Sequence, residues 1–157
     1  MIDITDELRR LVTALAEQRI DYALCGGMAM GVHGFLRTTI DIDLLILSES
    51  LDNVLALAQS LGYSIRGKEM SFADGAVEIR RVSKIDPDDG EVLSLDLLLV
   101  TPDIRSAWDS RIEADWEGRK LSVVSRDALI ALKTLRGSLQ DLADIQALNE
   151  KGSNEAG

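Results

Sequence analysis

The sequence predicts an α/β (α+β) fold, in which helices pack on a small mixed β-sheet. Three observations lead to this prediction. Apolar residues recur at helical spacing in several segments, short runs rich in β-branched and aliphatic residues lie between them, and 46% of the 157 residues are hydrophobic. That length and apolar content suffice for one core. We expect a single domain over residues 1–150 and, because residues 151–157 show no periodicity, a disordered tail.

The first half of the chain alternates between helices and strands. An acidic turn after Thr5 and a helical repeat of apolar residues begin the first helix. The pair Gly26-Gly27 separates a short apolar run from a short helical segment, which predicts a strand, a turn and a helix. Ser48 is expected to cap the next long helix, and Gly62 to end it. The expected elements are a helix over 5–18, a strand over 22–25, a helix over 28–33, a strand over 38–47 and a helix over 48–61.

Turn residues divide the second half of the chain. The loop from Asp86 to Gly90 has strong turn chemistry, Pro102 opens a helix and Gly137 ends another. Ser138 is expected to cap the last helix, so that two helices follow each other at the C-terminal end. The expected elements are strands over 63–66, 76–83 and 92–100, a helix over 102–112, a short edge strand over 120–124, and helices over 125–135 and 139–148.

The charge balance bears on the class of ligand. The chain has 17 Lys and Arg against 27 Asp and Glu, a net charge of −10, which repels the backbone of long nucleic acids. It does not oppose a nucleoside triphosphate, which meets carboxylates through Mg²⁺. A single cysteine, no charged-then-apolar leader and no apolar run near the roughly 20 residues of a membrane span predict a cytoplasmic protein without a disulfide or a membrane partner.

Two acids interrupt the buried strand expected over 38–47. Because strand side chains alternate between faces, Asp41 and Asp43 project to the same side. Like charges so close raise each other's pKa unless a cation lies between them, and Mg²⁺ is the simplest such cation. The alternative is a solvent-facing strand with exposed acids, which the apolar residues 44–47 oppose. We interpret the pair as metal ligands.

A third acid interrupts a second apolar strand. Asp96 lies between leucines, where a core would not place a carboxylate without a partner. If its strand neighbours that of Asp41 and Asp43, the three acids converge, and Asp96 could ligate the metal and help to deprotonate an acceptor hydroxyl. An edge strand that exposes Asp96 is the alternative.

Several residues around the acids suit a triphosphate. Gly26-Gly27 would leave free backbone N–H groups and allow close approach of a ligand, although the pair could also be only a tight turn. Arg37 and Thr39 precede the acids and could reach phosphate oxygens or the base, and Lys133 offers a point charge for the same phosphates. A solvated Arg37 and a Lys133 that complements a helix C-terminus are the alternatives.

These residues together resemble the nucleotidyltransferase superfamily typified by DNA polymerase β-like enzymes. Its signature is a hydrophobic residue before Gly-Gly or Gly-Ser, a spacer, Asp-hydrophobic-Asp or Glu, and a third acid on a later strand. The matching residues are Leu24-Cys25-Gly26-Gly27, a spacer of thirteen residues, Asp41-Ile42-Asp43, and Asp96. The resemblance implies the fold of that superfamily.

A closer resemblance is to small bacterial proteins around the AbiEii-type toxins. The matching stretches are Gly26-Gly27-Met28-Ala29, His33-Gly34, Arg37 to Asp43, Lys133, and Asp141 to Ile145, so the likeness covers about residues 20–148. In that family the C-terminal Lys and the first Asp take part in nucleotide handling or catalysis, which implies such a role for Lys133 and Asp141. The alternative for Asp141 is a first-turn charge of a helix.

The function expected from these residues is Mg²⁺-dependent transfer of a nucleotidyl group from a nucleoside triphosphate to an acceptor hydroxyl, with release of pyrophosphate. Asp41, Asp43 and Asp96 would hold two metal ions. The acceptor is open between a small molecule, as in aminoglycoside modification, and an RNA end. The alternative function is a catalytically silent binding module of a toxin–antitoxin or regulatory system, with an antitoxin-like protein partner.

Overall fold

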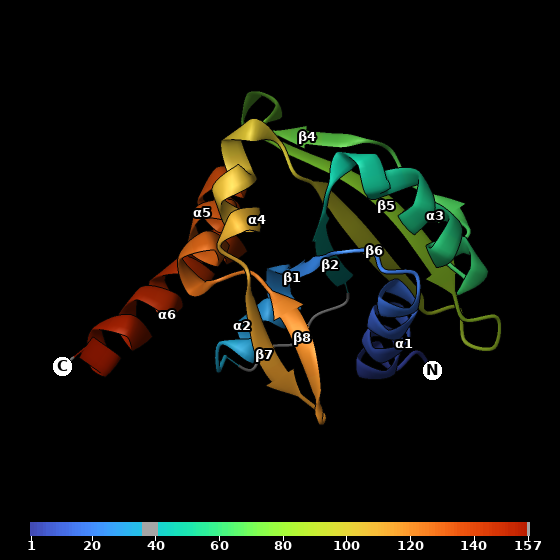
Figure 1. The fold of residues 1–157 in the computed structure, drawn as a ribbon, viewed down its shortest axis with the longest axis horizontal. Helices are drawn as coiled ribbons and strands as arrows, with labels where there is room; N and C mark the ends of the chain where they lie inside the picture. Colours follow the sequence, from blue (N-terminus) through green and yellow to red (C-terminus); the bar gives the residue numbers. More distant parts are fainter. Residues whose placement is uncertain (36–40, 157) are drawn as a thin grey trace.

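The protein is an α/β structure built on one mixed sheet, as predicted. The computed structural model describes residues 1–35 and 41–156. Within these residues eight strands form a sheet in the order β3, β5, β6, β2, β1, β8, β7, with β4 also paired to β5. Figure 1 shows the sheet between two groups of helices, α1 and α3 on one side and α4, α5 and α6 on the other.

The elements have the following bounds. The strands are β1 Ala23–Cys25, β2 Asp41–Ile46, β3 Ile65–Arg66, β4 Met70–Phe72, β5 Val77–Ile85, β6 Val92–Leu99, β7 Ile112–Trp116 and β8 Arg119–Val123. The helices are α1 Ile4–Glu17, α2 Gly26–Val32, α3 Leu51–Ser60, α4 Arg105–Asp109, α5 Arg126–Arg136 and α6 Leu139–Ala156, with 3₁₀ turns at Ser48–Ser50, Ala73–Gly75 and Pro102–Ile104.

The centre of the sheet joins parallel and antiparallel pairs. Strand β2 pairs in parallel with β6 and antiparallel with β1, and β1 pairs in parallel with β8. The outward neighbours β5 and β7 are antiparallel to β6 and β8. The adjacency of the two acid-bearing strands, β2 and β6, is therefore confirmed.

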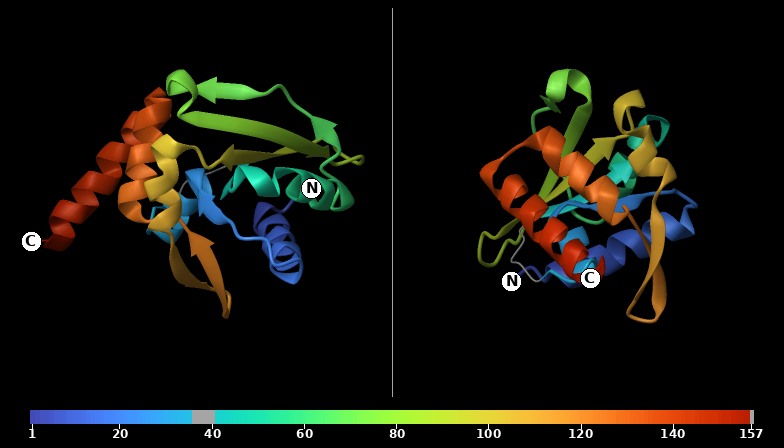
Figure 2. Two further views of the ribbon diagram at one scale, coloured as in Figure 1. Left: turned by 45° about the horizontal axis from the view of Figure 1, so that its top comes forward. Right: turned by 90° about the vertical axis from the view of Figure 1, so that its left-hand side faces the viewer.

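The core lies mostly between the sheet and helices α1 and α3. Apolar residues of α1 such as Leu8, Leu11 and Leu15 are almost completely buried, as is Leu44 on the facing side of β2. Burial of each such side chain stabilises the fold by roughly 1.5–3 kcal/mol. Figure 2 shows α1 and α3 lying along the same side of the sheet. No helix of the described residues is long and apolar enough to cross a membrane.

Two of the expected helix starts were wrong. Helix α1 is capped by Asp3, whose carboxylate accepts from the backbone N–H groups of Thr5 and Asp6. An ionised carboxylate is an effective cap at the positive end of a helix. Ser48 makes no capping hydrogen bond, because a 3₁₀ turn comes before α3 and its hydroxyl instead donates to the carbonyl of Val100.

The segment after Pro102 differs most from the prediction. The helix expected over 102–112 ends at Asp109, and Ile112–Trp116 forms a strand that pairs with Arg119–Val123. Glu117 and Gly118 both have positive φ, the geometry of a tight hairpin turn. The strand expected at an edge over 120–124 is consequently interior, since β7 covers it. Strand β4 was also not predicted.

The C-terminal helical pair has the predicted caps. The Ser125 hydroxyl accepts from the N–H of Ala128, and Gly137 ends α5 with φ +67°. Ser138 and Asp141 form a capping box, in which the N–H of each donates to the side chain of the other. Helix α6 extends to Ala156, and the disorder expected over 151–157 remains a prediction.

Candidate active site

A row of charged side chains crosses three strands on one face of the sheet. The strand register sets Asp43 opposite Asp96, and Arg81 opposite Asp96 on the other side. Residues directly opposite each other point to the same face, and Asp41, two residues before Asp43, points there too. Cys25 of β1 continues the row beyond Asp43. The three acids predicted from the sequence therefore lie side by side, opposite the face covered by α1 and α3.

Asp43 is the least compensated member of this row. It is 7% exposed, and its Oδ1 atom has no hydrogen-bond partner among the described residues. Burial, and then the negative charge of Asp96, raise the pKa of Asp43 to about 7, although Arg136 and Lys133 oppose the rise. A buried carboxylate without full compensation is costly to ionise. The site is therefore short of positive charge at Asp43.

Asp41 lies at the solvent end of the same face. Its side chain is 33% exposed, and the Nη2 atom of Arg81 lies 3.9 Å from its Oδ2 atom. Burial, followed by the charge of Asp96, raises the pKa of Asp41 above its ordinary value. Asp41 and Asp43 thus share a common electrostatic neighbour in Asp96.

Asp96 is held by an arginine that the sequence analysis did not identify. Arg81 donates from Nε to Oδ1 at 2.7 Å and from Nη2 to Oδ2 at 2.9 Å, while Asp96 is only 1% exposed. This two-bond geometry between guanidinium and carboxylate is strong and directional. The available signal was a basic residue on the strand that the loop Asp86 to Gly90 joins to the strand of Asp96.

Gly26 is required by the close approach of Asp43. It adopts φ +66°, and a Cβ atom at this position would lie 2.1 Å from Asp43 Oδ2. Any other residue would therefore be strained in its backbone and would collide with the carboxylate. Gly27 is buried at the start of α2. The glycine pair lies beside the acids, as the motif predicts.

Lys133 of α5 and Asp141 of α6 lie next to Asp43 and Gly26. A small pocket is lined by Gly26 and Asp43 from the sheet end and by Lys133, Arg136 and Asp141 from the helices. Lys133 is almost completely buried, and Arg136, which the sequence analysis did not single out, is on the turn that follows it along α5. The structure thus brings the predicted lysine and aspartate next to the acid row.

The buried lysine also has a structural role. The Nζ atom of Lys133 donates to Asp144 Oδ2 at 2.9 Å and lies 3.7 Å from Asp141 Oδ1. These contacts, with the capping box at Asp141, fasten α5 to α6. Arg37 and Thr39, predicted to contact nucleotide, lie outside the described residues.

The fit of a divalent metal can be judged from the donor set. No three or more His, Cys, Asp or Glu side chains of the described residues are grouped closely enough to hold a metal ion. The residues nevertheless have suitable chemistry, because carboxylate oxygens are the ligands that Mg²⁺ prefers and Asp43 Oδ1 is buried without a donor from the part of the chain that the structure describes. The acid row fits a metal in its chemistry, although the carboxylates are not assembled around one.

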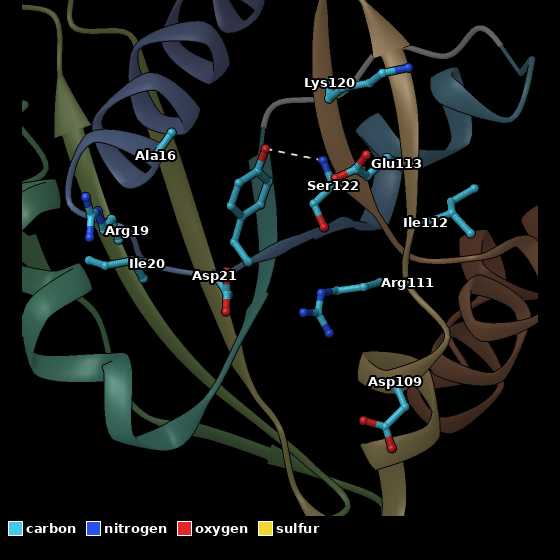
Figure 3. Close-up of a pocket in the computed structure, with 11 residues that line it drawn as sticks. Ala16, Arg19, Ile20, Asp21, Asp109, Arg111, Ile112, Glu113, Lys120 and Ser122 are labelled. Carbon is cyan, nitrogen blue, oxygen red and sulfur yellow. Dashed lines mark hydrogen bonds between the residues drawn. The ribbon is translucent and has the colours of Figure 1, made fainter.

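A hollow much larger than the small pocket beside Asp43 lies elsewhere on the described surface. It encloses about 560 Å³ between the end of α1, the end of α4 and the hairpin of β7 and β8. Figure 3 shows Asp109, Arg111 and Ser122 around it. Tyr22 also lines it, and its hydroxyl accepts from the N–H of Ser122. Its walls are lined by three cationic and three acidic side chains, and by none of the three acids of the row. Volume alone therefore does not mark the site.

Comparisons with known proteins agree on the fold. No family model matches the sequence, and no curated protein matches it. ANT(2'')-Ia in complex with adenylyl-2''-tobramycin has 17% identity and a TM-score of 0.65, over 96% of this chain and 90% of that one. The lincosamide antibiotic adenylyltransferase LnuA, lincomycin-bound, has 18% identity and a TM-score of 0.61, over 92% and 95% of the two chains.

A third solved structure is a provisionally assigned nucleotidyltransferase of Thermotoga maritima. It has 15% identity and a TM-score of 0.62, over 96% of both chains. At such identities the likeness extends to the fold, and each alignment covers nearly the whole of both proteins. The chain has the nucleotidyltransferase fold.

Proposed function

We propose that the protein is a Mg²⁺-dependent nucleotidyltransferase that transfers a nucleotidyl group from a nucleoside triphosphate to a hydroxyl of an acceptor. The observation that carries the proposal is the juxtaposition of Asp43 with Asp96 across β2 and β6, with Asp41 on the same face. Two neighbouring buried carboxylates, with a third partly exposed beside them, are costly to keep together and serve no packing purpose. The nucleotidyltransferase fold of the chain supports the same activity.

The reaction is an in-line displacement at the α-phosphorus. The acceptor hydroxyl oxygen forms a bond to that phosphorus, the bond to the bridging oxygen of the β-phosphate breaks, and pyrophosphate leaves with the electron pair. Asp96 takes the proton of the hydroxyl, and Lys133 and Arg136 compensate charge on the phosphates. Gly26 leaves room for the Asp43 carboxylate, and the backbone N–H groups of Gly26 and Gly27 are proposed to bind the triphosphate. Arg37, Thr39 and Asp141 are proposed to contribute further nucleotide contacts.

Asp41, Asp43 and Asp96 would hold Mg²⁺, as two ions. Bound Mg²⁺ would neutralise charge on the phosphates and make the acceptor oxygen more nucleophilic. The protein's own contribution is to place oxygen ligands on one face and to leave Asp43 Oδ1 without a donor among the described residues. Such a carboxylate gains more from a cation than one that is already partnered.

The proposed acceptor is a small molecule with several hydroxyl groups and a positive charge. The net charge of −10 disfavours an RNA end and favours a cationic acceptor. Two proteins of the same fold carry small acceptors, tobramycin in adenylylated form and lincomycin. An RNA end is the alternative that the experiment below also tests.

The experiment measures transfer of label from each α-³²P-labelled nucleoside triphosphate, with Mg²⁺, to a panel of amino sugars and lincosamides and to RNA. Wild-type protein is expected to label a small acceptor and to release pyrophosphate. Asp41→Asn and Asp43→Asn should each reduce the rate by roughly 10²–10³-fold, because each removes charge from the site of phosphoryl stabilisation. Asp52→Asn is the matched control, since Asp52 is exposed on α3, away from the acid row.

The second candidate is a catalytically silent binding module. The observation that favours it is the engagement of both Asp96 oxygens by Arg81. A stable complex with a protein partner and no label transfer from any nucleotide would support this candidate and reject the enzyme. The likeness to AbiEii-type toxins and an antitoxin-like partner remain predictions.

A further inference from the structure

Arg81 bonds to both carboxylate oxygens of Asp96, on the side of β6 opposite to Asp43. Its two N–H groups bond to both carboxylate oxygens, at 2.7 and 2.9 Å. Among the described residues, Arg81 is the cation that pairs with Asp96. In the structure as it stands, Asp96 is therefore engaged by a guanidinium.

The same guanidinium extends toward a second acid. Arg81 Nη2 lies 3.9 Å from Asp41 Oδ2, so one cationic group serves Asp96 directly and Asp41 at longer range. Asp43 lies opposite Asp96, and its Oδ1 atom has no donor within residues 1–35 and 41–156. A cation shared by all three carboxylates would thus have to compete with Arg81 for Asp96.

The surroundings of Arg81 allow such competition. Its side chain is 36% exposed, whereas the Asp96 side chain is 2% exposed, so the pair is accessible from the arginine side. The stem of Arg81 packs against the backbone of Gly67, where a Cβ atom would lie 3.2 Å from Arg81 Cβ. Because Gly67 has no side chain, the aliphatic part of Arg81 contacts only backbone atoms at this residue.

We infer that Arg81 is a positioning residue that stands in for a divalent cation at Asp96 and is exchanged for it when the site is loaded. This inference rests on the proposed function, because it concerns the same acids. Through its two hydrogen bonds Arg81 holds the Asp96 carboxylate in one orientation, and it releases at least one of these bonds when a divalent cation binds. Replacing Arg81 should therefore make the empty site bind a divalent cation more tightly.

The experiment measures binding of Mn²⁺, an oxygen-ligated substitute for Mg²⁺, by electron paramagnetic resonance without nucleotide and at physiological ionic strength. Arg81→Gln is expected to bind Mn²⁺ about tenfold more tightly than wild type, since a competing cation has been removed. Arg81→Lys, which keeps the charge but cannot make two parallel bonds, should lie between the two. Near-UV circular dichroism checks that each variant is folded, and Arg81→Lys serves if Arg81→Gln does not fold.

Arg80→Gln is the matched control. Arg80 is the preceding residue on β5, points to the opposite face and pairs with Glu69 and Glu78. The substitution removes the same unit of charge from the same strand. Because Arg80 points away from the acids and is already paired with two carboxylates, Mn²⁺ affinity should change by no more than about twofold.

Asp96→Asn identifies the contact responsible. With Asn at position 96, Arg81→Gln should no longer increase Mn²⁺ affinity, since the competition is for the Asp96 carboxylate. The inference is overturned if folded Arg81→Gln and Arg81→Lys bind no more tightly than wild type, or if the gain survives Asp96→Asn. Label transfer by wild type is measured separately from Mn²⁺ binding. The proposed exchange of Arg81 for a cation can therefore be rejected while the proposed transferase activity stands, and the transferase activity can be rejected while the exchange stands.

Discussion

The two faces of the sheet bury carboxylates in opposite ways. On the face covered by α1 and α3, Glu7 is 8% exposed and both of its oxygens have donors. The Tyr63 hydroxyl donates to Oε2 and Lys84 Nζ donates to Oε1, each at 2.8 Å. On the other face Asp43 is equally buried, yet its Oδ1 atom has no donor among the described residues.

This difference separates a cluster that supports the fold from one suited to binding. Lys84 also donates to the carbonyl of Leu61 and lies 5.0 Å from the centre of the Tyr63 ring, so α1, the end of α3 and β5 are joined through satisfied groups. Such a network adds stability and needs no ligand. The acid row instead retains excess negative charge, which a cation can neutralise.

The largest expected effect on stability concerns Asp43 in metal-free buffer. Burial and Asp96 raise the pKa of Asp43 to about 7 in the folded protein, whereas in the unfolded chain it titrates near about 4. Below about pH 4 both states hold the proton, and this carboxyl imposes no cost. As pH rises from about 4 to 7, the unfolded chain binds fewer protons than the folded one, so stability falls.

Asp43→Asn removes this pH-dependent cost. Each tenfold change in acid dissociation constant is worth about 1.4 kcal/mol, so the free energy of unfolding of the variant, relative to wild type, should rise by about 4 kcal/mol between pH 4 and pH 8. Urea titrations in EDTA at the two pH values measure the difference. An offset that is the same at both pH values would show that Asp43 titrates normally, and Asp52→Asn should show no pH-dependent offset.

The convergence of the acids could be predicted because it depends on local rules. Alternation along one strand places Asp41 and Asp43 on one side whatever the rest of the fold does. Asp96 required one further assumption, that its strand lies beside theirs, and β6 does pair with β2. Their roles in catalysis remain predictions.

Arg81 could not be found by the same reasoning because its partner is set by a register between two strands. The hairpin is closed by the N–H of Asp86, which donates to the carbonyl of Glu91 at 2.8 Å. Arg81 precedes Asp86 by the same number of residues as Asp96 follows Glu91, so this turn sets Arg81 opposite Asp96. Without the exact pairing of the turn residues, a one-residue shift would have put Arg80 there instead.

The strand Ile112–Trp116 was missed for a different reason. Its five residues include two acids and follow a helix opened by Pro102, so helical and strand patterns compete over a short length. What decides the outcome is the turn at Glu117 and Gly118, which folds the segment back on β8. The helical contacts of Lys133 were also beyond sequence reasoning, since they depend on how α5 packs against α6.

The next effect in size tests the satisfied cluster. Glu7→Gln removes the negative charge between Tyr63 and Lys84 and leaves the lysine without its carboxylate. Because Lys84 is 16% exposed and partly hydrated, we expect a loss of roughly 2–3 kcal/mol, below the full cost of breaking a buried pair. Urea unfolding at pH 7 measures the loss, and nucleotidyl transfer should be unchanged. Reduced transfer by folded protein would mean that the two faces are coupled.

The smallest effect examines one bond within that cluster. Tyr63→Phe removes the hydroxyl that donates to Glu7 and keeps the ring beside Lys84, so the loss should be about 1 kcal/mol, the usual net value of a hydrogen bond. In the Glu7→Gln background the same substitution should cost less, because the acceptor there is no longer charged. Equal costs in the two backgrounds would mean that the hydroxyl acts independently of the carboxylate. If the loss of stability caused by Tyr63→Phe depends on Glu7, and Mn²⁺ binding is unaffected, the charge of Glu7 is compensated within the protein on the face covered by α1 and α3. The acids Asp41, Asp43 and Asp96 would then differ from Glu7 in depending on a cation from outside.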